Sequence, residues 1–215
     1  MNFLQMQTYI SRRLLDPNNT AVSLEDVKGA INDAISYWKL RRFWFNEVSD
    51  FAFLTAQDPN FPYPDDFLVP ALQNDGFNIE YGGIRYTLAK VSESVYDGIW
   101  LANGYGLPQY YARLGDDEYQ CYPIPDRNYQ VNRHYLKDFD DLVDDGDEND
   151  FTIYASRLIN LWSLANLSGE LRQDEKMEQY YRSGANNEYN NLLVMTAKSN
   201  ATGTLTTNSI LTTDW

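Results

Sequence analysis

The spacing of apolar positions changes twice along the chain and divides it into a helical, a strand-rich and a second helical region. Apolar side chains recur every three or four residues over 2–15 and again after Ser23, which predicts two amphipathic helices. Asp16-Pro17-Asn18-Asn19 ends the first, because proline disfavours helical backbone at the residue before it. Ser23 and Asp26 form a variant of the capping box that begins the second. The apolar face of this second helix contains Val27, Ile31, Ala34, Ile35 and Trp38.

From Phe43 to about Lys137 the pattern is aromatic and short in period, with frequent proline and glycine. It predicts strands at 50–55 and 129–136, a hairpin over 79–86 that turns at Gly82-Gly83, and a second hairpin over 108–123. Residues 63–67 predict a turn, and residues 92–101 predict a short helix that begins at Ser92. The region as a whole therefore predicts a small β-rich domain.

Helical spacing returns after Asp150, which we expect to be the N-cap of a third helix. The expected apolar face of that helix contains Tyr154, Leu158, Leu161, Trp162, Ala165 and Leu171. A fourth helix is predicted over about 174–198, with apolar positions at Met177, Tyr181, Tyr189, Leu192 and Leu193. Residues 199–215 are rich in threonine and too polar to fold alone, yet they carry Leu205, Ile210, Leu211 and Trp215.

These segments predict the α+β class: an antiparallel α-helical bundle with an inserted small β domain and an extended C-terminal arm. The expected division is 1–44 for the first half of the bundle, 45–138 for the β domain, 139–198 for the second half and 199–215 for the arm.

The charge balance narrows the classes of partner. The 215 residues contain 17 Lys and Arg against 31 Asp and Glu, a formal net charge of −14, which argues against duplex-DNA binding through clustered basic side chains. No apolar run approaches the roughly 20 residues of a membrane span, and the N-terminal residues show no signal-peptide pattern. A single cysteine, Cys121, fits a reducing compartment. The 17 tyrosines suit either an interface or half-buried strand faces.

Candidate catalytic and metal chemistry is sparse. The one histidine, His134, lies in a predicted strand, so the sequence shows no signature of a Ser–His–Asp or Cys–His nucleophile system, and we expect it to have no chemical role. One Cys and one His cannot form a zinc motif. We therefore predict no enzyme activity, no cofactor and no metal site.

Three charged segments remain. Residues 138–150 are densely acidic but do not match the ligand positions of an EF-hand, so a solvated loop is favoured and a weak cation site stays open. Arg12-Arg13 and Arg41-Arg42 end predicted helices, where cations complement the helix dipole.

The whole pattern resembles the head-to-tail adaptor proteins of tailed bacteriophages, especially the tail accessory factors of short-tailed phages. The resemblance is carried by a helix and the segments that follow it: VKGAINDAISYW (27–38), RRFWFNE (41–47), FAFLT (51–55), YPDDF (63–67), GLPQYYA (106–112) and YPIPDRNY (122–129).

The resemblance implies a structural virion protein without enzymatic activity that forms a ring, expected to be a dodecamer, beneath the portal protein. It implies that the arm docks on the portal through Leu205, Ile210, Leu211 and Trp215, and that Trp38, Trp162, Tyr181 and Tyr189 contribute to packing between subunits. The implied further partner is a distal tail or nozzle protein. DNA would pass through the lumen without specific binding, and no membrane is involved. The implied location is the head–tail interface of the virion, after assembly in the host cytoplasm.

Two alternatives stay open from the residues themselves. One is a cell-wall (peptidoglycan) glycosidase that uses some pair of the 31 acidic side chains. The other is a carbohydrate-binding module built on the tyrosine-rich β region.

Overall fold

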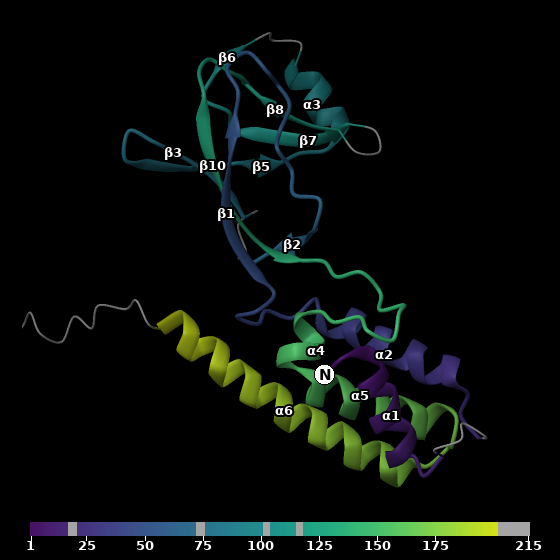
Figure 1. Ribbon diagram of the computed structural model, residues 1–215. Coiled ribbons are helices and arrows are strands. Elements are labelled where there is room, and N and C mark those ends of the chain that lie inside the picture. The colour runs from purple at the N-terminus through teal and green to yellow at the C-terminus, as the bar shows by residue number, and fades with distance from the viewer. Residues whose placement is uncertain (17–20, 72–75, 101–103, 115–117, 202–215) are drawn as a thin grey trace, which may run out of the picture. The chain divides into compact units, whose positions relative to one another are not determined.

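The computed structural model describes residues 1–16, 21–71, 76–100, 104–114 and 118–201 (Figure 1). The chain divides into two compact units. The helical unit contains residues 1–45 and 140–215, and the β unit contains residues 46–139. Among the described residues, no helix is both long and apolar enough to cross a membrane.

The helical unit is organised around α5 (Ser156–Glu170), which packs against α1 (Phe3–Arg13), α2 (Leu24–Trp38), α4 (Asp150–Tyr154) and α6 (Glu175–Ala201) (Figure 1). The predicted capping box at Ser23 and Asp26 is confirmed, and all five predicted apolar positions of α2 are buried. The Ser163 hydroxyl donates to the Ala30 carbonyl at 3.0 Å and so ties α5 to α2.

The third predicted helix is wrong in two respects. Its N-cap is Asn149, whose side-chain oxygen accepts from the Thr152 amide at 3.1 Å while the Thr152 hydroxyl accepts from the Asn149 amide at 3.0 Å. Asp150 instead occupies the first turn. At Ala155 the backbone leaves the helical conformation, with φ −127° and ψ 19°, and separates α4 from α5. As a result Tyr154 is 52% exposed rather than part of a continuous apolar face.

The main sheet of the β unit is antiparallel, with strand order β1 (Glu47–Leu54), β10 (Tyr129–Lys137), β3 (Phe77–Tyr81) and β4 (Ile84–Thr87); β2 (Phe67–Pro70) pairs with the end of β10. The predicted hairpin through Gly82 and Gly83 is confirmed, and both glycines have positive φ, 62° and 76°. At Gly76 (φ +67°) a Cβ would overlap the His134 carbonyl, so glycine permits this close approach of the chain to β10.

Smaller elements complete this unit. β5 (Ala89–Lys90), β7 (Tyr110–Leu114) and β8 (Glu118–Tyr122) form a three-stranded sheet, and β6 (Tyr105–Gly106) pairs with β9 (Ile124–Pro125). The predicted short helix is α3 (Glu93–Trp100). The largest core cluster contains Leu54, Phe61, Phe77, Ile79, Leu88, Tyr111, Cys121, Tyr129 and Val131.

Candidate functional site

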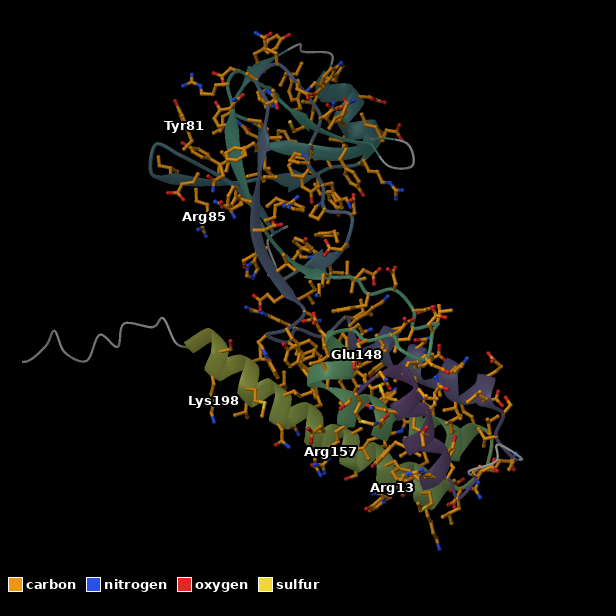
Figure 2. All side chains as sticks on the ribbon, viewed as in Figure 1. Arg13, Tyr81, Arg85, Glu148, Arg157 and Lys198 are labelled. Atoms are coloured by element: carbon orange, nitrogen blue, oxygen red, sulfur yellow. The ribbon has the colours of Figure 1, made fainter. Side chains whose placement is uncertain are left out.

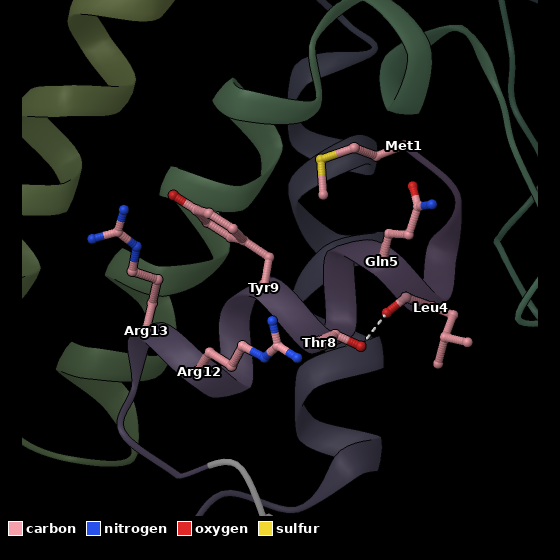
Figure 3. Close-up of a pocket in the computed structure, with 7 residues that line it drawn as sticks. All are labelled: Met1, Leu4, Gln5, Thr8, Tyr9, Arg12 and Arg13. Atoms are coloured by element: carbon pink, nitrogen blue, oxygen red, sulfur yellow. Dashed lines mark hydrogen bonds between the residues drawn. The ribbon is translucent and has the colours of Figure 1, made fainter.

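A groove runs along the exposed side of α1 in the helical unit (Figure 3). The apolar stripe of α1 is buried at Phe3, Met6 and Ile10, which leaves the opposite side of the helix to line the groove. The hollow has a volume of about 570 Å³ and is lined by Met1, Leu4, Gln5, Thr8, Tyr9, Arg12 and Arg13. Part of its lining is apolar: the Leu4 side chain lines the groove and is 46% exposed.

A second hollow of about 380 Å³ shares Met1, Tyr9 and Arg13 and extends to α5 and α6. The rest of its lining is Ser156, Arg157, Asn160, Leu161, Tyr180 and Tyr181. We call the two hollows together the basic groove, because their lining includes Arg12, Arg13 and Arg157 and no acidic side chain. The Arg13 guanidinium lies 5.4 Å from the centre of the Tyr9 ring, within the range of a cation–π contact.

Residues 140–148, the acidic loop, are held in one conformation next to the start of α1. The Asn32 side chain exchanges two hydrogen bonds of 3.0 Å with the backbone of Leu142. The Asp147 carboxylate accepts from the amides of Val143 and Asp144, both at 2.8 Å, and these bonds lower the pKa of Asp147. The loop carbonyls of Asp145 and Asp147 accept from the first amides of α1.

The acidic loop therefore presents its charges to solvent from a fixed backbone. Its exposed carboxylates belong to Asp140, Asp141, Asp144, Asp145 and Glu148. Among the described residues, no group of three or more His, Cys, Asp or Glu side chains could hold a metal ion.

The β unit carries a polar cluster that the sequence did not indicate. The His134 ring joins two residues of β1: its Nδ1 lies 2.7 Å from the Ser49 hydroxyl and its Nε2 lies 2.5 Å from a Glu47 carboxylate oxygen. A serine, an imidazole and a carboxylate in series are the parts of a nucleophile system. In the portion of the chain that is described, however, the Ser49 hydroxyl has His134, its neighbour across the ladder, as its hydrogen-bond partner. We assign the cluster to cross-strand stabilisation, because Ser49 and His134 are direct partners in the ladder.

The residues predicted to mediate assembly fall into two groups. Leu205, Ile210, Leu211 and Trp215 lie outside the described residues. The structure brings Trp38, Trp162 and Tyr189 into one aromatic cluster, with ring centroids 5.0 Å apart for the two tryptophans and 4.8 Å for Trp38 and Tyr189. Tyr181 is buried away from this cluster and lines the basic groove. A role for these four side chains between subunits stays a prediction.

The comparison with known families defines the class of protein. The model of the SU10 adaptor protein family matches residues 1–208. The chain therefore belongs to the SU10 adaptor protein family, which confirms the resemblance to phage head-to-tail adaptors. A search of curated proteins gave no match.

Proposed function

We propose that this phage adaptor forms a ring, expected to be a dodecamer, that docks on the portal protein and connects the capsid to the tail. The observation that carries the proposal is the family match over residues 1–208. In this proposal the protein is a structural component of the virion and not an enzyme. Its partners are the portal protein, further copies of itself and a distal tail or nozzle protein.

The net charge of −14 supports passage of the genome through the ring. Duplex DNA carries dense negative charge, so an acidic lumen repels phosphate and does not hold the passing duplex. The protein therefore contacts DNA without specific binding.

The portal-docking residues in this proposal are Leu205, Ile210, Leu211 and Trp215. These apolar side chains are spaced along a threonine-rich sequence, which has little apolar surface to bury within its own chain. A segment of this composition gains a large contact surface when it binds along a partner, and that gain offsets the cost of ordering it. The helices of the proposed protomer form an antiparallel bundle into which the β domain is inserted.

The test is to mix the purified protein with the portal protein of the same genome and image the product by electron microscopy. We expect a symmetric ring of this protein on the portal. A truncation after Ala201 keeps α6 complete and removes the proposed docking segment, so it should stay folded and lose docking. A matched full-length variant with Leu205, Ile210, Leu211 and Trp215 replaced by serine separates the loss of apolar contacts from the loss of chain length. Docking retained by both variants would overturn the assignment of the segment.

The glycosidase alternative is tested by turbidity clearing of purified peptidoglycan. We expect no clearing by the protein alone or by the portal complex. Clearing that disappears on substitution of an acidic side chain would replace the structural role with an enzymatic one.

A further inference from the structure

The helical unit carries two exposed surfaces of opposite charge that do not neutralise each other within one chain. The basic groove contributes Arg12, Arg13 and Arg157, and the acidic loop contributes five exposed carboxylates. Among the described residues, the one ion pair formed by either surface is Arg157 with Glu188 at 3.7 Å, and it leaves the Arg157 side chain 77% exposed. The described lining of the groove thus holds three arginines and no acidic side chain, in a chain with 31 acidic and 17 basic residues.

The apolar parts of the two surfaces also match. Met1 and Leu4 are exposed beside the arginines of the groove. Val143 is 70% exposed between the carboxylates of the acidic loop. A contact between the surfaces would therefore cover apolar side chains on both sides while it pairs opposite charges around them, the arrangement typical of a protein–protein interface.

Both surfaces are organised before any contact forms. Hydrogen bonds from Asn32 and Asp147 hold the acidic loop, and its carbonyls bind the amides of Phe3 and Leu4 at the start of α1. Arg12 and Arg13 occupy the last turn of the same helix. Figure 2 labels Glu148, which lies in the acidic loop just before α4, and Arg13, which lies at the C-terminal end of α1. A rigid loop and a helix-borne groove lose little conformational entropy on binding.

Asp145 of the acidic loop lines a neighbouring hollow of the same chain together with Leu4 and Arg12. No ion pair joins the loop to the groove within the described part of one chain. The charges of the two surfaces are therefore available to a second molecule.

We propose that the basic groove of one copy receives the acidic loop of the next copy. This inference rests on the proposed ring and names the contact that closes it. Because groove and loop are different surfaces of one unit, each copy offers one of each, and the contact repeats from head to tail. The occupant is thus a second copy of this chain, recognised through carboxylates that surround Val143.

The first experiment is a charge exchange, read as assembly on the portal by mass photometry and electron microscopy. Arg12→Glu with Arg13→Glu should weaken association between copies at least about tenfold at low salt, as should Asp144→Arg with Asp145→Arg. All four substitutions in one chain should restore assembly, because the exchanged charges again meet between copies. Matched controls reverse exposed charges of the same unit that line neither hollow, Lys176→Glu and Glu170→Arg, and should leave assembly unchanged.

The second experiment tests proximity directly with cysteines at the proposed contact. A chain that carries both Arg13→Cys and Asp144→Cys should cross-link on the portal into a ladder of covalent multimers, whereas each single variant should not. The native Cys121 is buried and does not compete for the cross-linker. Circular dichroism of each variant checks that it is folded.

The outcomes distinguish a failure of the proposed groove–loop contact from a failure of the proposed ring. Rings of the Arg12→Glu, Arg13→Glu variant with wild-type stability would overturn the contact and leave the proposed function standing. Cross-linked dimers without higher multimers would show a two-fold contact and also overturn it. A wild-type protein that forms no ring on the portal would overturn both. If the groove substitutions abolish binding to a short DNA duplex but not self-association, the occupant is nucleic acid and the proposal is wrong.

Discussion

The two units of this chain stabilise their interiors in different ways. The interior of the helical unit is chiefly aliphatic and aromatic, with buried residues such as Phe3, Ile31 and Leu158. The interior of the β unit contains tyrosine rings whose hydroxyls face polar partners: the Tyr135 hydroxyl donates to the Asp66 carboxylate at 2.7 Å, and the Tyr129 hydroxyl donates to Asp126 at 2.5 Å. The helical unit buries the Asp16 carboxylate, which accepts from the amides of Ala21 and Val22, whereas the β unit joins buried tyrosines to carboxylates at its surface.

Because of this difference, we expect the stabilities of the two units to respond differently to changes in side-chain volume and in pH. A closely packed core such as that of the helical unit responds chiefly to the volume of its side chains. A core that includes hydroxyls and a thiol responds to pH as well, because an ionised phenolate or thiolate is poorly tolerated where it is cut off from water. The following predictions test that contrast.

We expect the largest difference in folding stability between the two units at high pH. Burial raises the pKa of Tyr63, Tyr96 and Tyr135 well above the ordinary value, and it raises the pKa of Tyr129 and Cys121 to about 12. In the unfolded chain these groups lose their protons near pH 10 for tyrosine and about 8.5 for cysteine. Between those values and about pH 12 the folded unit binds more protons than the unfolded one, so its stability falls as pH rises.

We expect the helical unit to persist to higher pH than the β unit, although burial raises the pKa of Tyr181 there as well. The measurement is an alkaline titration that follows tyrosine ionisation by ultraviolet absorbance and each unit by backbone hydrogen exchange. Loss of the helical unit first would contradict the comparison.

The next largest effect is expected in the β core. Phe77 is buried on the inner face of the sheet and contacts the rings of Phe61, Phe67 and Tyr111. Phe77→Ala should lower the free energy of unfolding of this unit by about 3–5 kcal/mol, because it leaves a cavity that the rings cannot fill. The matched control is Phe51→Ala on the outer face, where the side chain is 57% exposed and the loss should stay within about 0.5 kcal/mol. Urea unfolding of both variants provides the measurement.

A polar contact inside the β unit should have an intermediate effect. Arg133 forms a two-bond pair with Asp50, at 2.7 Å and 2.5 Å, and also donates to the Pro62 carbonyl at 3.0 Å. Asp50→Asn should destabilise the unit by about 1–3 kcal/mol, because the half-buried guanidinium loses its counter-charge. The charge-neutral pair Asp50→Asn with Arg133→Gln should recover part of the loss in a double-mutant cycle. Additive losses would show that the two side chains do not depend on each other.

Local signals in the sequence predicted much of the fold. The Ser23–Asp26 cap and the Gly82–Gly83 turn each depend on residues within a few positions of one another, so spacing alone identifies them. The predicted N-cap of α4, Asp150, was wrong by one position, because the reciprocal bonds between Asn149 and Thr152 make Asn149 the cap.

The candidate surfaces needed contacts that no local pattern contains. Arg12-Arg13 was visible as a basic helix end, but the groove also needs Arg157, which α5 supplies from much later in the chain. The density of acid in residues 138–150 predicted an exposed loop, but its fixed conformation depends on Asn32, 110 residues before Leu142. The Ser49–His134 bond likewise depends on the pairing of β1 with β10.

The smallest predicted effect concerns the acidic loop, whose backbone is hydrogen-bonded to Asn32 of α2. Asn32→Ala removes both hydrogen bonds to the Leu142 backbone and should cost the helical unit about 1 kcal/mol, since Leu142 can still bury its side chain. The Leu142 amide should nevertheless exchange with solvent much faster, because in the wild-type protein it donates to the Asn32 side-chain oxygen. Asp33→Ala changes the next, exposed position of the same helix and should leave that exchange rate unaltered. Equal exchange in the two variants would mean that Asn32 does not hold the loop, and that the fixed presentation of Asp144 and Asp145 has another cause.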